Sequence, residues 1–256
     1  MGLAIKRTGA GEPVVLIHGL GSRGDAWGPM TEIVARASVV AQAAEDPLIS
    51  DDDKGYGGIS NVQRTVHEFE RAGVCAIQLE DQDLPKKCGS MDGKRLISTQ
   101  EMCGKIKAAV DTRNDENFLI IARTDAVAVE GIDATLDRLR AFSEAGADLT
   151  MVLGPYGVDA IPGFVAASRC PIAHLNSETR TMPQLSVTEM KRLGIAVSIL
   201  PISLLLAATR AMQHVLQHVK AMGTTDAVMD ELMVTWSDFN DLMNLPAVRE
   251  SEAKYL

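Results

Sequence analysis

Three consecutive carboxylates lie between an apolar run and a glycine-rich turn, in the stretch ISDDDKGYGG at residues 49–58. Alternate side chains of an extended segment point the same way, so Asp51 and Asp53 are expected to converge. Two carboxylates this close repel unless a cation neutralises them, and oxygen ligands suit a hard ion such as Mg²⁺. An EF-hand loop is excluded, because its fifth and twelfth positions would be Gly55 and Val62. The stretch indicates a divalent cation site or, as the alternative for an isolated DDD, a solvated acidic loop.

Charged and nucleophilic side chains also follow the next apolar run. That run ends in LEDQ, so Glu80 and Asp81 are expected at the same carboxyl-end rim as the first acidic stretch. In the loop DLPKKCGSMDGKRLIS, Cys88 follows Lys86 and Lys87, whose ammonium groups would lower the pKa of its thiol. This setting favours a thiolate, proton donor or nucleophile, whereas a single loop cysteine is often only a small buried side chain.

A later apolar run, FLIIA, continues into the segment ARTDA. The guanidinium of Arg123 in this segment can donate two parallel hydrogen bonds to one carboxylate. Arg123 could therefore hold a substrate carboxylate or neutralise the acidic rim.

Short β-branched runs alternate with longer segments of helical period, the pattern of a parallel sheet with helical crossovers. Eight strands are predicted, the number that closes a TIM-type barrel, at residues 14–17, 38–41, 47–50, 74–79, 118–122, 148–152, 171–175 and 195–200. Helices are predicted at 61–72, 99–113, 131–145, 158–168 and 186–193, with two or three closing helices after residue 200. Expected helix-capping residues are Asn61, Ser98 and Ser186. The predicted class is α/β, a (β/α)₈ barrel with C-terminal helices.

The beginning of the chain does not fit a regular barrel. Only residues 42–46 separate the second and third predicted strands, whereas a parallel crossover needs a dozen or more residues. Either SVVA at 38–41 is not a barrel strand, or a helix is missing. We expect residues 1–46 to be an atypical leader that supplies the first barrel strand from VVLI at 14–17, with a helix around 27–36, and residues 47–256 to form the barrel.

Composition excludes several classes of protein. The formal net charge is −9 and the basic residues form no long run, so no nucleic-acid partner is expected. No apolar stretch approaches the roughly 20 residues that cross a bilayer, and no signal-peptide pattern opens the chain. The four cysteines show no C-x-x-C spacing. A soluble cytoplasmic protein with reduced thiols is therefore expected.

Three motifs resemble, in the same order along the chain, those of the isocitrate lyase and phosphoenolpyruvate mutase superfamily, specifically its methylisocitrate lyase-like members. ISDDDKGYGG is similar to the family's D-x-D-x-G-Y-G metal motif, and LEDQDLPKKCG to its E-D-Q…P-K-[KR]-C-G loop. The third motif is ARTDA, and the resemblance covers about residues 47–256. It implies a (β/α)₈ barrel with an exchanged helix, a homo-oligomer that in the family is usually a tetramer, and a small carboxylate substrate.

The resemblance also implies roles for individual residues. The metal, Mg²⁺ or Mn²⁺, would be bound by Asp51, with Asp53 and Glu80 acting largely through water. Lys86 and Cys88 would belong to a mobile lid, and Cys88 would protonate the carbanion that C–C bond cleavage leaves. The implied substrate-binding residues are Arg123, Gly89 and Glu178.

Some residues depart from the family pattern. Leu153 replaces a family glutamate, and Leu175 occupies the place of an asparagine. Lys54 and Ser90 replace a threonine and a lid histidine. These departures concern the substrate side of the site, so the substrate is left open by the sequence.

Several functions compete. A Mg²⁺-dependent C–C lyase of 2-hydroxy or 2-oxo di- or tricarboxylates fits the motifs best, and a phosphonomutase or a catalytically impaired barrel are the alternatives. The segment GEPVVLIHGLGSRGDAWGPM resembles an α/β-hydrolase strand and oxyanion loop. No G-x-S-x-G nucleophile elbow occurs in the chain, so His18 is expected to be a loop histidine and a serine hydrolase is disfavoured.

Overall fold

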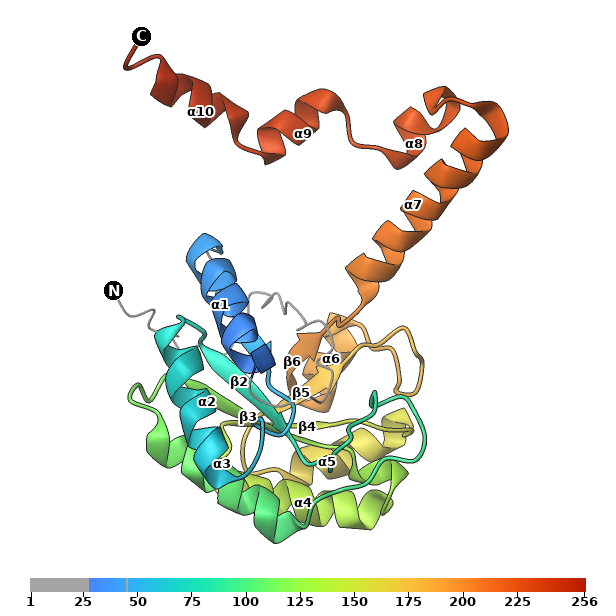
Figure 1. Ribbon diagram of the computed structural model, residues 1–256. Coiled ribbons are helices and arrows are strands. Elements are labelled where there is room, and N and C mark those ends of the chain that lie inside the picture. Colours follow the sequence, from blue (N-terminus) through green and yellow to red (C-terminus); the bar gives the residue numbers. More distant parts are fainter. Residues whose placement is uncertain (1–27, 45) are drawn as a thin grey trace. The chain divides into compact units, whose positions relative to one another are not determined.

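The computed structural model describes residues 28–44 and 46–256 (Figure 1). The described residues up to Pro201 form one compact unit, and Ile202–Leu256 form a second. The first unit contains a six-stranded sheet in the sequential order β1-β2-β3-β4-β5-β6, with every neighbouring pair parallel. The strands are β1 (Ile49–Asp51), β2 (Ala76–Glu80), β3 (Leu119–Thr124), β4 (Leu149–Val152), β5 (Ile172–Leu175) and β6 (Ile195–Ile199). Sequential parallel order brings all the strands' carboxyl ends to the same rim of the sheet.

A helix crosses over between each pair of consecutive strands (Figure 1). These helices are α2 (Ile59–Arg71), α3 (Thr99–Thr112), α4 (Ile132–Glu144), α5 (Ile161–Ala167) and α6 (Val187–Leu193), and α1 (Gly28–Ala43) precedes β1. Two one-turn 3₁₀ helices, η1 (Ala126–Ala128) and η2 (Val158–Ala160), lead into α4 and α5. The alternation confirms the predicted α/β class.

Side chains of the two sheet faces form separate apolar clusters. On β2, Ile77 and Leu79 pack with α2 and α3, whereas Ala76 lies in a cluster on the opposite face with Ile121 of β3. A third cluster joins α4, α5 and α6 to the outer side of β4–β6. The period-two alternation along each strand therefore separates a helix-covered face from an inner face.

Six of the eight predicted strands are present, and one prediction is wrong. SVVA at 38–41 lies inside helix α1. Its β-branched residues suggested a strand, but apolar side chains recur along α1 at helical spacing and pack on the core beside α2. That packing overrides local β-propensity. The apolar positions are Ile33, Val34, Ala37, Val40 and Ala41.

Of the other predictions for the first 46 residues, one is confirmed and the rest lie outside the described residues. A helix after residue 27 is confirmed for the described residues, while VVLI at 14–17 and His18 lie outside them. Closure into an eight-stranded barrel is not shown by the six strands of the described residues. That residues 1–46 supply a barrel strand stays a prediction.

Helix ends largely follow the expected chemistry. Ser98 and Ser186 cap α3 and α6, and each side-chain oxygen accepts a hydrogen bond from the backbone N–H three residues later. The prediction of Asn61 as a cap is wrong, because Gly58 is the N-cap of α2 and the Asn61 side chain instead accepts a hydrogen bond from the Gly58 N–H at 3.1 Å. Gly73 has a φ of 88° where the chain turns from α2 toward β2.

The second unit consists of helices with no buried residue. They are α7 (Ser203–Met222), η3 (Asp226–Val228), α8 (Met229–Leu232), α9 (Trp236–Leu242) and α10 (Leu245–Glu252). Large apolar side chains are exposed along this unit, including Leu204 at 81% and Trp236 at 76%. The predicted closing helices are confirmed.

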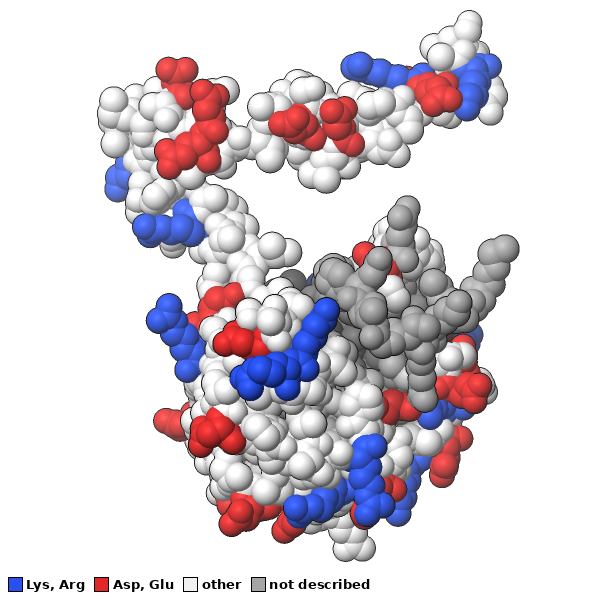
Figure 2. All heavy atoms as spheres, turned by 180° about the vertical axis from the view of Figure 1, so that it is seen from behind, with Lys and Arg blue, Asp and Glu red and all other residues white. Residues whose placement is uncertain are grey.

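Acidic and basic side chains are interspersed over the described part of the face in Figure 2, with no extended basic surface. None of the helices formed by the described residues has the length and apolar character that a bilayer crossing needs.

Candidate active site at the carboxyl ends of the strands

The turn after β1 places the acidic stretch at the rim of the sheet. Four of its residues have positive φ, with values of 52° at Asp53, 78° at Gly55, 57° at Tyr56 and 151° at Gly57. A side chain at Gly55 would also collide with Val62, whose Cγ2 lies 2.5 Å from an ideal Cβ. This conformation and close approach explain the glycines of the motif.

Hydrogen bonds from β2 fix the position of this turn. The Asp52 N–H donates to the Gln78 carbonyl at 3.0 Å, and the Glu80 N–H donates to the Asp53 carbonyl at 2.7 Å. These hydrogen bonds fix the register of the acidic stretch relative to β2, the strand that carries Glu80.

The three aspartates have different surroundings. Asp51 accepts a hydrogen bond from Gln78 Nε2 at 3.0 Å, and Asp53 pairs with the ammonium of Lys86. Asp52 is fully buried and accepts hydrogen bonds from Ser50 at 3.1 Å and Tyr56 at 3.2 Å. Burial, with the neighbouring Asp51 charge, raises the pKa of the Asp52 carboxyl well above its usual range. Asp52 is thus a structural residue.

Glu80 is a buried carboxylate between two cations. Arg123 Nη1 lies 2.8 Å from its Oε2, and Lys86 Nζ lies 3.5 Å from its Oε1. Neither carboxylate oxygen accepts a hydrogen bond, and the side chain is 1% exposed. Burial raises the pKa of Glu80 to about 7, although the two cations act in the opposite direction. The free hydrogen-bonding capacity of these two buried oxygens leaves room for a cation in place of the Lys86 ammonium.

Arg123 is oriented by a second acidic residue. Its Nε donates to Asp125 Oδ2 at 2.9 Å, and Lys94 Nζ lies 3.7 Å from Asp125 Oδ1. Lys94 also donates to the carbonyl of Gly89. A Cβ on Gly89 would lie 2.4 Å from Leu153 Cδ2 and 2.9 Å from Arg123 Nη2. A side chain at this position would therefore displace Leu153 or the Arg123 guanidinium.

The lid segment reaches across to the loop after β5. Ser90 Oγ donates to Thr179 Oγ1 at 2.9 Å and lies 3.3 Å from Thr181 Oγ1. Cys88 is exposed on this segment. Glu178, beside Thr179, is exposed as well. The two loops that the resemblance assigned to the substrate therefore meet at Ser90.

The structure brings several predicted residues together. Ion pairs connect Asp53, Lys86, Glu80 and Arg123, and Gly89 packs on Arg123. Three residues of this network were missed by sequence reasoning, namely Gln78, Lys94 and Asp125. Asp125 follows Arg123 by two residues, the spacing that puts both side chains on one face of an extended chain.

Asp81 does not belong to this network, contrary to expectation. Its carboxylate is fully buried and accepts hydrogen bonds from Thr124 Oγ1 at 2.6 Å and the Asp125 N–H at 3.0 Å, and it pairs with Arg138 at 3.1 Å. Burial raises the pKa of Asp81 to about 6. Asp81 joins β3 to α4, which is a structural role.

A divalent cation fits the donor chemistry of this rim. Asp51, Asp53 and Glu80 supply oxygen ligands only, and both oxygens of Glu80 are buried without a hydrogen bond. In the described part of the chain no three acidic, His or Cys side chains converge closely enough to hold an ion in the present arrangement. The ammonium of Lys86 instead contacts two of these carboxylates. Metal binding at these residues stays a prediction.

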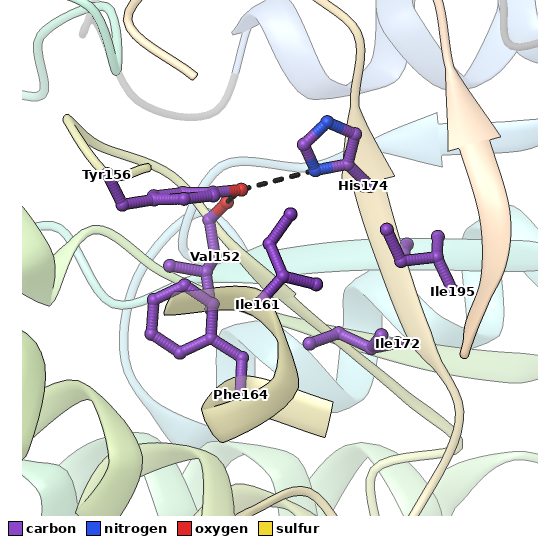
Figure 3. Close-up of a pocket in the computed structure, with 8 residues that line it drawn as sticks. Val152, Tyr156, Ile161, Phe164, Ile172, His174 and Ile195 are labelled. Carbon is purple, nitrogen blue, oxygen red and sulfur yellow. Dashed lines mark hydrogen bonds between the residues drawn. The ribbon is translucent and has the colours of Figure 1, made fainter. Parts of the chain in front are cut away.

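A small apolar pocket lies apart from these residues, between β5 and α5 (Figure 3). Inside it the Tyr156 hydroxyl is 3.3 Å from His174 Nδ1, and His174 Nε2 is 2.9 Å from the Pro183 carbonyl. Burial lowers the pKa of His174, so the neutral ring is favoured. His174 thus anchors the loop that carries Glu178, and we assign this pocket a structural role.

Comparisons with known proteins define the class. A family model described as phosphoenolpyruvate phosphomutase matches residues 17–220, and the chain belongs to this family, part of the isocitrate lyase and phosphoenolpyruvate mutase superfamily. The chain is 46% identical to 2,3-dimethylmalate lyase of Eubacterium barkeri over 233 residues, which is 88% of this chain and 78% of the relative. It is 35% identical to 2-methylisocitrate lyase of Aeropyrum pernix, over 88% of this chain and 72% of the relative.

Solved structures agree with this assignment. A phosphonopyruvate hydrolase in complex with oxalate and Mg²⁺ is similar with a TM-score of 0.77 and 28% identity, over 88% of this chain and 78% of that one. The predicted family resemblance is confirmed, and so is the expectation of an enzyme of the carbon–carbon lyase class. The hydrolase-like character of the first residues is not tested.

Proposed function

We propose that this chain is a Mg²⁺-dependent lyase that cleaves a C–C bond of a small 2-hydroxy dicarboxylate. The observation that carries the proposal is the network in which Lys86 of the lid contacts Asp53 and Glu80, while Glu80 pairs with Arg123. It combines an acidic cation site, a carboxylate clamp and a covering loop at one rim. These are the parts that such a cleavage requires.

The residues have separate roles in this proposal. Arg123, oriented by Asp125, holds a substrate carboxylate through its remaining donors. Asp51, with Asp53 and Glu80 around it, would hold a Mg²⁺ ion, which would supply Lewis acidity to the substrate. The substrate hydroxyl gives up its proton to water and the C–C bond breaks, and the Cys88 thiol then protonates the carbanion next to the leaving carboxylate. The Cys88 thiolate takes up a proton from water when the products leave. Gly89 and the lid exclude water.

The inner rim also supports a particular kind of substrate. The ends of β1, β2 and β3 carry Asp51, Glu80 and Arg123, whereas the ends of β4, β5 and β6 carry Leu153, Leu175 and Ile199. The latter three belong to one apolar cluster with Met182. A 2-hydroxy dicarboxylate with alkyl branches matches this division, since buried apolar walls disfavour a third carboxylate.

We therefore propose 2,3-dimethylmalate before 2-methylisocitrate, which carries a further carboxylate. A phosphonomutase is the second candidate because of the family description. The apolar side of the rim disfavours it, since a transferred phosphoryl group requires cationic donors there. A catalytically impaired barrel is the third.

A substrate panel tests this proposal. The purified chain with Mg²⁺ is incubated with 2,3-dimethylmalate, 2-methylisocitrate, isocitrate, oxaloacetate and phosphonopyruvate, and products are followed by NMR. We expect the highest kcat/KM with 2,3-dimethylmalate and a loss of about tenfold in the Leu153→Asn variant. Turnover of phosphonopyruvate alone would favour the mutase, and turnover of none would favour the impaired barrel.

We also propose that the chain forms a homo-oligomer. The exposed apolar side chains of the second unit support this, because such surfaces favour association. Light scattering at micromolar concentration is expected to give a multiple of the chain mass, and a monomer at all concentrations would exclude the proposal.

A further inference from the structure

A lysine is buried beneath the candidate metal site. Lys105 of α3 has a side chain that is 1% exposed. It lies on the helix face that also buries Met102, Ile106 and Ala109. Burial lowers the pKa of Lys105 to about 8, which reflects the free energy cost of removing an ammonium group from water. A charged group in this position requires strong compensation.

The partners of Lys105 belong to the acidic turn. Its Nζ donates to the Gly57 carbonyl at 2.8 Å and to the Lys54 carbonyl at 3.1 Å, and lies 3.8 Å from Glu101 Oε1. The two carbonyls flank Gly55 and Tyr56, where the backbone has positive φ. The ammonium therefore holds both sides of the bend that follows the three aspartates.

This bend needs external support. Positive φ at the non-glycine residues Asp53 and Tyr56 is unfavourable and persists only where surrounding contacts fix it. Backbone hydrogen bonds from β2 fix Asp52 and Asp53, and Thr65 Oγ1 makes a longer contact of 3.4 Å with the Gly55 carbonyl. Lys105 makes the shorter contacts to the far side of the turn.

We propose that Lys105 is a positioning residue for the candidate metal site, whose two hydrogen bonds hold the turn so that Asp51 and Asp53 bind a divalent cation. This inference rests on the metal site of the proposed function. A buried methionine would avoid the cost of the charge but would supply no donor to the Lys54 and Gly57 carbonyls, so the ammonium is explained by the turn that it holds.

The test measures Mn²⁺ binding to the full chain by electron paramagnetic resonance, with the melting temperature recorded in parallel. We expect Lys105→Met to raise the Mn²⁺ Kd of the folded protein about tenfold or more, the loss expected for a charge-assisted hydrogen bond, and to lower the melting temperature, because two carbonyls lose their donor. Lys107→Met removes an exposed lysine of the same helix and is the matched control, with Kd unchanged. An unchanged Kd in Lys105→Met would overturn the proposal.

A second variant covers failure to fold. Lys105→Gln retains an amide donor, so we expect a Kd between those of the wild type and Lys105→Met. If both variants unfold while Lys107→Met folds, Lys105 supports the fold itself and the proposal is overturned. If the wild type and Asp51→Asn bind Mn²⁺ equally, the metal site of the proposed function fails, and the role of Lys105 fails with it.

Discussion

Glu80 and Arg123 are direct partners across β2 and β3, and their side chains form an ion pair of 2.8 Å in which both are almost fully buried. A buried pair of this kind is a weak source of net stability, yet removing one partner leaves an uncompensated charge. The retained pair therefore points to a role at the rim, where Asp125 and Lys86 extend it on both sides.

The first prediction concerns this pair. Arg123→Met is expected to abolish activity and to lower the free energy of unfolding by about 3 kcal/mol, because Glu80 loses its closest cation. Adding Glu80→Gln should restore most of the stability and none of the activity. Denaturant unfolding checks both changes, with the exposed Arg140→Met as the control, for which a change below about 1 kcal/mol is expected. An equal loss in the single and double variants would contradict the pairing.

The second prediction follows from the pKa of Glu80, about 7 in the folded chain against 4.5 for the free side chain. Burial causes the rise, Arg123 and Lys86 oppose it, and Asp51 and Asp125 add to it. The native state binds this proton more tightly, so its contribution to stability is complete below pH 4.5 and is lost as the pH rises through 7.

The difference between wild type and Glu80→Gln isolates this contribution from those of other carboxyls. Without metal, the wild type should lose about 3 kcal/mol more than Glu80→Gln between pH 4.5 and pH 8. Urea unfolding at the two pH values measures it. Parallel pH profiles for the two proteins would show that Glu80 is not responsible.

The third prediction tests the proton donor. Cys88→Ala should lower kcat by about 10²- to 10⁴-fold with little change in KM, as expected when a general acid is removed. Cys170→Ala, at a half-buried cysteine away from the lid, is the matched control and should retain activity. Wild-type turnover in Cys88→Ala would remove the thiol from the mechanism.

The fourth prediction concerns the lid, residues 83–96. Its side chains contact the rest of the first unit, but the segment contains no helix or strand, so its amides should exchange faster than those of β3 without ligand. These contacts include the ion pairs of Lys86 and Lys94 and the hydrogen bonds of Ser90 with Thr179 and Thr181. Oxalate with Mg²⁺ should slow this exchange, and Ser90→Ala should weaken the effect. Hydrogen exchange by mass spectrometry measures it. A lid as protected as β3 without ligand would exclude its opening.

Most of the sheet could be predicted from the sequence, because its strands are short apolar runs, and β2, β4 and β6 follow Gly73, Gly146 and Gly194. The strand prediction for SVVA at 38–41 is wrong because these residues also continue the apolar face of a helix, and local composition does not distinguish a strand from a helix here. The difference between Glu80 and Asp81 follows from strand parity, which places consecutive side chains on opposite faces.

The residues that support the site could not be predicted as easily from the sequence. Lys94 and Lys105 contact the rim through the tertiary fold, and only the three-dimensional path of the chain reveals their partners. For Lys105 a signal existed, since a lysine interrupts the buried face formed by Met102, Ile106 and Ala109. A lysine on the apolar face of a helix is worth examining for buried carbonyl partners.

Metal-dependent cleavage of 2,3-dimethylmalate tests the central claim most directly. The reaction should yield pyruvate and propanoate in a one-to-one ratio when Mg²⁺ is present. We expect pyruvate formation to stop with a chelator, to return with added Mg²⁺, and to fall at least 10²-fold in Asp51→Asn. Equal pyruvate formation with chelator, or in Asp51→Asn, would contradict a metal-dependent lyase at this rim.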